Sequence, residues 1–384
     1  MGTTGFTAQA AGAGAEPEVR ATLARALLLA LALGLLILCL QWPILDGALW
    51  LLEGSSQVEA ITADYFSTRV WGAPATLGTF ALMGTLIGLG RSRTLLAVQL
   101  LLNGMNIALD VWFAGVLGWG AKGIALGTAI AEWTTFLVAA ALVFRILHGR
   151  RDDAEPLLPL TRLADRDRLR RLLAANSDIM IRTLLLVFGF TWFIRESARF
   201  GDDVLAANHI LLQVVSFSAF FLDGYAFVAE AIVGESVGAR NLARFDLAVR
   251  RSTELAGGTA LLLALLILSL GDPVVHAITR LDPVRAAAAQ GIPLAALYVG
   301  CSFAAFQLDG VFIGATRTRD MRNASILSVG VFLAAWWPLV QVAGNRGLWC
   351  AFVLYVCARA AALWRYYPAL RRSIASPSVA PAAT

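Results

Sequence analysis

Charged residues are scarce in this chain of 384 amino acids. They make up 15% of it, whereas an average soluble protein carries about 25%. Apolar residues account for 58%, and the mean hydropathy is +0.71. Apolar stretches long enough to cross a bilayer recur along the whole chain, and we count about ten of them. The shortage of charge therefore excludes a soluble globular protein and predicts an all-α, polytopic membrane protein.

The predicted spans are Thr22–Trp42, Phe66–Leu89, Leu95–Leu117, Ile124–Leu147, Ile179–Ile194, Leu205–Val233, Ala248–Leu270, Ala287–Ile313, Ser325–Ala343 and Leu348–Leu363.

Cysteine and histidine are also scarce, with four and three residues in the whole chain. No two cysteines have the spacing of a metal site or a redox motif, so we expect buried structural thiols. The sequence has no phosphate-binding loop, metal-ligand cluster or nucleophile constellation. It therefore predicts a protein that is not an enzyme and that needs no cofactor.

The basic residues are distributed unevenly. The net charge of +5 would suggest nucleic acid in a soluble protein, but most arginines fall in loops on one side of the predicted spans. By the positive-inside rule this side is the cytoplasm, and it also holds both termini. We therefore expect the basic charge to fix the topology, and we predict no nucleic-acid partner.

The longest break between spans, His148–Arg171, is rich in arginine and acidic residues and predicts a cytoplasmic connector at 148–171. Before it, residues 1–147 form a first lobe with a helix stub and four spans. After it, residues 172–372 form a second lobe with six spans. Residues 373–384 are rich in serine, alanine and proline and are predicted to be disordered.

The two lobes share a sequence repeat. When the chain is shifted by 226 residues, Gly84–Arg93 falls on Gly310–Arg319, and two glycines and two arginines coincide. Both segments lie in predicted cytoplasmic turns, so corresponding spans run in the same direction. Parallel repeats of this kind are typical of secondary transporters, with two six-helix bundles around a central cleft.

The repeat also exposes a deficit in the first lobe. The counterpart of the segment from Leu172 to Val228 would have to begin about fifty residues before Met1. The symmetry therefore predicts that the first lobe lacks one helix and most of a second.

A charge inside a bilayer costs about 2.5–3.5 kcal/mol on the insertion scale, so each intramembrane acid needs an explanation. In the first lobe, Asn106 and Asp110 are four residues apart on one helix face, and Thr128 lies in the next span. Their amide, carboxylate and hydroxyl oxygens suit a hard cation such as Na⁺, or a single proton on the carboxylate. The alternative is structural hydrogen bonding between helices.

In the second lobe the intramembrane acids are Asp223, Glu230 and Asp309. The two aspartates each precede a glycine, and we consider them candidates for gating or substrate binding, against structural pairing with a neighbour. Glu230 is a third candidate for gating or substrate binding. Like Glu132 in the first lobe, it lies nearer a helix end, and solvation there is the alternative. Under the 226-residue shift none of the acids repeats. This pattern predicts two similar lobes with different tasks.

Two intramembrane arginines are assigned local roles. Arg182 is four residues after Asp178, a spacing that predicts an ion pair within one helix. Arg69 lies near the outer end of its span, where its side chain is expected to reach the interface. Most aromatic residues should form packing contacts or interfacial belts. The candidates for contacting a flat organic cation in the cleft are Trp71, Phe80, Phe306 and Trp336.

Several motifs resemble one known family, the multidrug and toxic compound extrusion (MATE) transporters, and in particular its DinF-type branch. The segments that carry the resemblance are Met1–Ala13, Arg69–Ala75, Asn103–Asp110, Gly118–Gly123, Ala207–His209, Leu222–Gly224, Ala229–Glu230, Asp309–Gly310 and Gly314–Asn323. The resemblance covers essentially Met1 to Arg372.

The resemblance implies a twelve-helix antiporter that exports organic cations in exchange for H⁺ or Na⁺. In its relatives, a cation site in the first lobe combines an Asp of the first helix with three further residues, which Asn106, Asp110 and Thr128 resemble. Asp309 resembles an acid on the tenth helix. The first helix and its acid are absent here, so Met1 is interpreted as an internal methionine of a longer protein, or the chain as a natural remnant.

The resemblance thus predicts a cation-coupled drug exporter in a bacterial inner membrane, working as a monomer on small organic cations. Two alternatives remain: a truncated chain that does not transport, and a flippase for lipid-linked precursors with related architecture.

Overall fold

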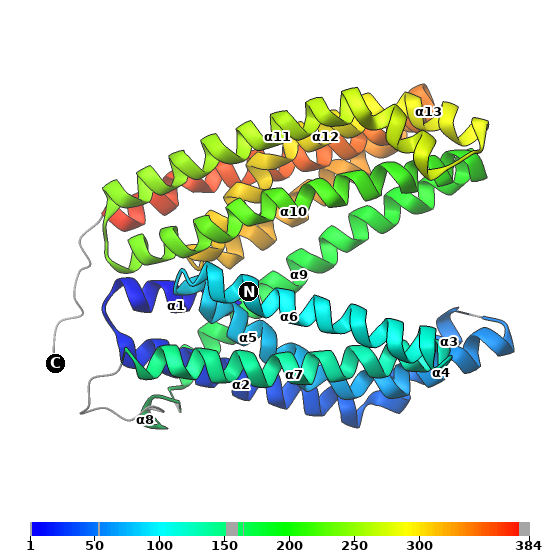
Figure 1. Ribbon diagram of the computed structural model, residues 1–384. Coiled ribbons are helices and arrows are strands. Elements are labelled where there is room, and N and C mark those ends of the chain that lie inside the picture. Colours follow the sequence, from blue (N-terminus) through cyan, green and yellow to red (C-terminus); the bar gives the residue numbers. More distant parts are fainter. Residues whose placement is uncertain (1, 53, 151–159, 164, 376–384) are drawn as a thin grey trace. The chain divides into compact units, whose positions relative to one another are not determined.

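The computed structural model describes residues 2–52, 54–150, 160–163 and 165–375, and within these ranges the chain is helical, without strands. It divides into two compact units, a first lobe that begins at Thr3 and a second lobe that continues from Leu173. Figure 1 shows the helices of both lobes coloured along the sequence.

The first lobe contains α1 (Gly2–Gly12), α2 (Glu16–Cys39), α3 (Gln41–Leu52), α4 (Ser56–Arg69), α5 (Ala73–Gly88), α6 (Ser92–Asp110), α7 (Gly120–His148) and the short α8 (Leu160–Leu163). The second lobe contains most of α9 (Arg166–Ser197), then α10 (Asp202–Gly238), α11 (Leu242–Ile278), α12 (Asp282–Gly314) and α13 (Thr318–Ala375).

Nine helices of the described chain are long and apolar enough to cross a membrane. The last of them, α13, is not one continuous helix, because Gly344 has φ 54° and ψ −131° and breaks it. The predicted spans Ser325–Ala343 and Leu348–Leu363 lie on the two sides of this break. Within the predicted connector 148–171, residues 151–159 and 164 lie outside the described residues, and α9 already begins at Arg166. The predicted tail lies outside them from residue 376 onward.

The 226-residue repeat is visible in the helix boundaries. Helices α1 and α10 end at Gly12 and Gly238, and α5 and α12 end at Gly88 and Gly314, each pair one repeat apart. The starts of α2 and α11, and of α6 and α13, are related in the same way. The internal symmetry seen in a few residues thus extends to the secondary structure of both lobes.

Backbone conformation repeats as well. A positive φ occurs at Gly14 (69°) and again one repeat later at Arg240 (52°). It recurs at Gly90 (64°) and Thr316 (56°). L-residues disfavour this left-handed region, which glycine tolerates. The second lobe therefore keeps the turn geometry of the first even where it has lost the glycine.

Close helix contacts explain the repeated glycines. A Cβ atom at Gly88 of α5 would lie 2.6 Å from the carbonyl oxygen of Thr4 on α1. At Gly314 of α12, the same atom would lie 2.5 Å from the carbonyl oxygen of Glu230 on α10. Thr4 and Glu230 are themselves one repeat apart. Both lobes are therefore built around the same backbone crossing, which only glycine permits.

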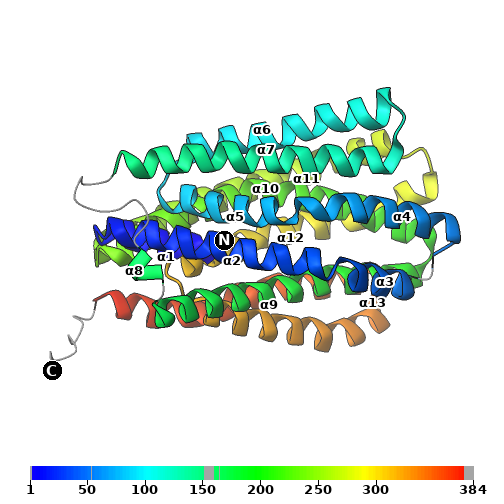
Figure 2. The same ribbon diagram turned by 90° about the horizontal axis from the view of Figure 1, so that it is seen from below.

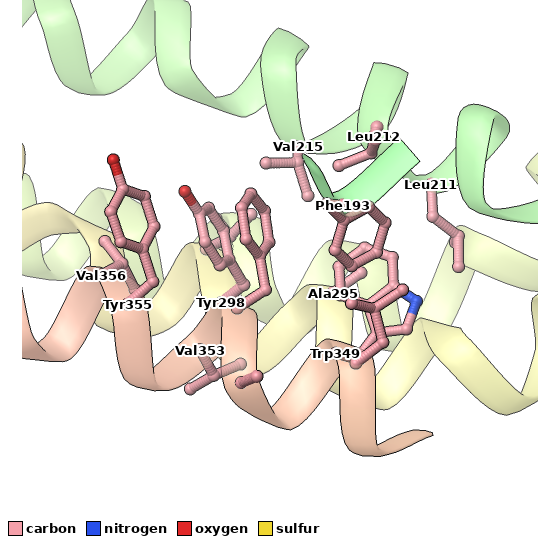
Figure 3. Packing of buried hydrophobic residues seen from close by; sticks show 14 of the residues in the cluster. Phe193, Leu211, Leu212, Val215, Ala295, Tyr298, Trp349, Val353, Tyr355 and Val356 are labelled. Carbon is pink, nitrogen blue, oxygen red and sulfur yellow. The ribbon is translucent and has the colours of Figure 1, made fainter. Parts of the chain in front are cut away.

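Each lobe has its own apolar core. In the first lobe Leu23, Leu82, Leu86 and Val143 join α2, α5 and α7. The core of the second lobe is more aromatic: Phe193 of α9 packs edge to face on Trp349 of α13, with ring centroids 4.8 Å apart. Figure 3 shows these two rings with the neighbouring Leu211 and Tyr298. The helices that carry the candidate residues are thus fixed by packing within each lobe.

Candidate functional site

In the first lobe the candidate residues lie on α6 and α7, which run alongside one another in both views (Figures 1 and 2). Asn106 Nδ2 donates a hydrogen bond to Thr128 Oγ1 at 2.9 Å, and Thr128 Oγ1 donates to the carbonyl of Ile124 at 2.9 Å. The structure therefore brings two of the three predicted cation ligands into direct contact. The contact also matches the structural alternative, in which an amide joins two helices.

Asp110 lies one turn further along the same helix. It is the last residue of α6, and a π-helical turn, Val111–Val116, follows it. Such turns interrupt helices with one extra residue and are frequent at functional sites. The carboxylate faces α7, where a Cβ at Gly127 would lie 2.7 Å from Asp110 Oδ1. The small residue on α7 thus makes room for the acid.

The Oδ1 atom of Asp110 is buried and accepts no hydrogen bond within the described part of the chain. An intramembrane carboxylate oxygen in this state is costly unless a proton or a cation satisfies it. Its free coordination capacity is therefore chemically suited to H⁺ or Na⁺.

Glu132 corrects a sequence prediction. It is not solvated, because it is only 7% exposed, and it pairs with Arg69, for which a position at the interface stays a prediction. The guanidinium donates two parallel hydrogen bonds to the carboxylate, at 2.7 and 2.6 Å. This bidentate pair joins α4 to α7. Beside it, Trp133 Nε1 donates to the carbonyl of Trp71, whose side chain is exposed, like that of Phe80.

The second lobe has a denser cluster of charge around Asp309 of α12, which is 4% exposed. Arg182 of α9 forms an ion pair with the Asp309 carboxylate, and Arg359 of α13 lies 3.3 Å from the same oxygen. The Arg359 guanidinium also stacks over the ring of Phe306, 5.5 Å from its centroid. Three helices therefore meet at one carboxylate.

The predicted pair between Asp178 and Arg182 is wrong. Arg182 is turned toward Asp309, and Asp178 accepts instead from Arg322 Nη1 at 2.6 Å and from Thr318 Oγ1 at 3.1 Å. The two residues are neighbours along α9, but each pairs with another helix: Arg182 with α12 and Asp178 with α13. A pair within one helix contributes only about 0.2–0.5 kcal/mol, which is too little to hold the two residues together against partners on other helices.

Asp223 and Glu230, both on α10, have different surroundings. Asp223 lies within electrostatic range of Arg182, Asp309 and Arg359, so it belongs to the same charge cluster. Glu230 is 2% exposed, and the alternative that it is solvated is therefore wrong. Of the predicted aromatic residues, Phe306 contacts the cluster through Arg359, whereas Trp336 packs edge to face on Trp192 at 5.3 Å.

The residue that sequence reasoning missed is Arg359. It is 2% exposed in the second lobe, and the sequence signal was available, because an arginine in an apolar span requires a buried partner. What the sequence did not show was that Asp309, a candidate of its own, is that partner.

A family model described as MatE matches residues 1–112 and 179–336, which include Asn106, Asp110 and Asp309. The chain belongs to the MatE family. The match extends to both lobes, so the repeated helical units are those of this family, and the chain is a multi-pass membrane transporter.

Curated MATE relatives support this assignment. The DNA damage-inducible protein F of Escherichia coli K12 is 36% identical over 95% of this chain and 79% of its own length. A probable multidrug resistance protein NorM of Aromatoleum aromaticum is 26% identical over 79% of this chain and 64% of its own length. The DinF-type resemblance inferred from motifs is thus confirmed.

Solved structures agree on the fold. A crystal structure of MATE in the straight conformation superposes with a TM-score of 0.89 at 17% identity, covering 97% of this chain and 83% of its own. A Vibrio cholerae MATE transporter in the bent form gives a TM-score of 0.82 at 18% identity, covering 97% of this chain and 84% of its own.

Proposed function

We propose that this MATE chain is a secondary transporter that exports small organic cations in exchange for H⁺ or Na⁺. The observation that supports this best is Asp110 Oδ1, a buried carboxylate oxygen with no hydrogen-bond donor in the described chain. Asn106 and Thr128, hydrogen-bonded to each other one turn away, place two further oxygens on the same pair of helices. Asp110 would hold the coupling ion.

The second lobe has the opposite electrostatic character. Asp309 faces two arginines, and its charge is already balanced without an external cation. Asp223 is a second acid within electrostatic range of both arginines. We therefore assign ion coupling to Asp110, and the joining of α9, α12 and α13 to Asp309.

The test is transport by protein reconstituted in vesicles, with ethidium as the organic cation and with an imposed pH or sodium gradient. The Asp110→Asn variant should lose gradient-driven export and keep the thermal stability of the wild type, because the amide leaves no buried charge. An exposed acid of the same lobe provides the control, and Asp64→Asn should transport normally. Export by Asp110→Asn at the wild-type rate would refute the assignment.

The two gradients also identify the ion. Export driven by the pH gradient alone would make the ion a proton, and export driven by the sodium gradient alone would make it Na⁺. If neither gradient drives export through the wild type, the chain does not act as an exporter of ethidium.

One observation favours the second candidate, a flippase for lipid-linked precursors. Such substrates carry phosphates, and in direct contact around Asp309 two bases, Arg182 and Arg359, share a single carboxylate. Scrambling of a fluorescent polyprenyl diphosphate in the same vesicles, without any gradient, would support this candidate over antiport.

A further inference from the structure

A basic pocket lies at the end of the first lobe where α5 turns into α6 and α7 ends. Its volume is about 420 Å³. The residues that line it are Arg91, Thr94, Leu142, Arg145, Ile146, Gly149 and Arg150. Three arginines thus line a small pocket, and Leu142 and Ile146 form an apolar part of its wall.

Two of these arginines have no acidic partner in the part of the chain that the structure describes. Within the described residues, the side chains of Arg91 and Arg145 form no ion pair or hydrogen bond, whereas Arg150 is paired with Glu16. Arg91 also occupies the N-cap position of α6, and no side chain accepts a capping hydrogen bond from the free backbone amides at the start of this helix. The positive end of a helix dipole therefore adds to the two arginine charges.

The equivalent turn of the second lobe can be compared with this pocket. One repeat later, the counterpart of Arg91 is Arg317, which is paired with Asp320. The counterpart of Arg145 is Arg371, which is bound to Asp246 by two hydrogen bonds of 2.8 and 2.7 Å. The same turn is thus neutralised by acids of its own in the second lobe.

The first lobe has replaced both of these acids. At the position of Asp320 it has Thr94, and at the position of Asp246 it has Arg20. The first lobe thus keeps the two bases of the repeated turn but has a hydroxyl and another base in place of the two acids, and of these replacements Thr94 lines the pocket. Among the described residues, no acid neutralises Arg91 or Arg145, and their charge therefore favours an anionic ligand.

The location indicates which anion. The spans Ser92–Val116 and Gly120–His148 begin and end at this pocket, so it lies at the boundary of the bilayer, where lipid phosphates are found. Guanidinium groups and helix N-termini bind phosphate oxygens, and the apolar wall suits the first carbons of an acyl chain. An inorganic phosphate would leave this wall without a contact.

We propose that the pocket formed by Arg91, Thr94 and Arg145 binds the phosphate headgroup of an anionic phospholipid. The lipid replaces the two acids that neutralise the equivalent turn of the second lobe. Occupation of the pocket would hold the α5–α6 turn against the end of α7.

The test uses the full chain, stripped of lipid in detergent and titrated with phosphatidylglycerol or phosphatidylcholine. Bound lipid is counted by native mass spectrometry, and melting is followed in parallel. We expect phosphatidylglycerol to bind and raise the melting temperature, and phosphatidylcholine to do neither. Affinity for phosphatidylglycerol should fall about tenfold or more in Arg91→Gln/Arg145→Gln and stay unchanged in the control Arg371→Gln.

A second variant protects the test against a folding defect. Thr94→Asp introduces the acid that the second lobe has at this position, so it should neutralise Arg91, keep the lipid-free protein as stable as the wild type, and abolish the effect of phosphatidylglycerol. Equal binding by wild type and Thr94→Asp would overturn the proposal. So would equal stabilisation by inorganic phosphate, which would show that the lipid tail plays no part.

Discussion

The two lobes share a backbone but not a charge pattern. Helix ends, glycine crossings and even positive-φ turns recur at a spacing of 226 residues. No intramembrane acid recurs: Met83 occupies the position of Asp309, and Trp336 the position of Asp110. The glycines at the helix crossings recur because a larger side chain would clash with the neighbouring backbone. A buried charge can be accommodated at different positions, and the two lobes carry their charges at different positions. The residues that repeat are therefore those that build the scaffold, and the charged residues that do not repeat are the candidates for function.

The sharpest test of this contrast compares the two acids. Removing the charge in Asp309→Asn leaves Arg182 and Arg359 buried with one carboxylate fewer, and breaking a buried pair costs about 3–5 kcal/mol. Asp110→Asn deprives no arginine of its partner and should melt like the wild type. Thermal melting in detergent, followed by the loss of monodisperse protein, measures both. Equal melting of the two variants would remove the distinction between the lobes.

The pair of Arg69 and Glu132 exists only in the first lobe, since the second lobe has Ala295 and Ala358 at the equivalent positions. Glu132→Ala should cost about 1–3 kcal/mol, because it leaves the guanidinium without its carboxylate. Adding Arg69→Ala should recover most of that loss, which a double-mutant cycle of unfolding measures. No recovery in the double variant would mean that the pair does not act as a unit.

The glycine crossings should respond alike in both lobes. Gly88→Ala and Gly314→Ala each place a methyl group against a backbone carbonyl and should cost about 1–3 kcal/mol through overpacking. Gly104→Ala on α6 is the matched control, because nothing lies within 4 Å of the added atom. Melting temperatures of the three variants decide the matter. A large loss in only one of the two lobes would contradict the shared crossing.

The smallest effect concerns the turns at Gly90 and Thr316. Thr316→Gly relieves a positive φ and should stabilise the protein by about 1 kcal/mol, and Gly90→Thr should destabilise it by a similar amount. Because the two changes are reciprocal, the swapped double variant should melt close to the wild type. A loss of stability in Thr316→Gly would show that the threonine side chain contributes more than its backbone costs.

The sequence predicted the helical membrane fold and the two-lobed repeat, because apolar length and glycine spacing carry that information directly. It also placed Asn106 and Thr128 close enough to interact, since α6 and α7 are adjacent in the chain. It failed where partners come from distant helices. Arg182 was assigned to Asp178, four residues away, whereas its partner is Asp309. Solvation was an alternative for Glu132 and Glu230, but both are buried, since distance from a helix end is a poor measure of burial.

The cluster at Asp309 has a consequence for how the protein is made. Arg359 lies on the part of α13 that follows the break at Gly344, and an isolated arginine in a span costs about 2.5–3.5 kcal/mol to insert. Asp309 and Arg182 come earlier in the chain, so α9 and α12 leave the ribosome before this part of α13. We therefore expect its insertion to depend on α12, which carries the carboxylate that offsets the charge of Arg359.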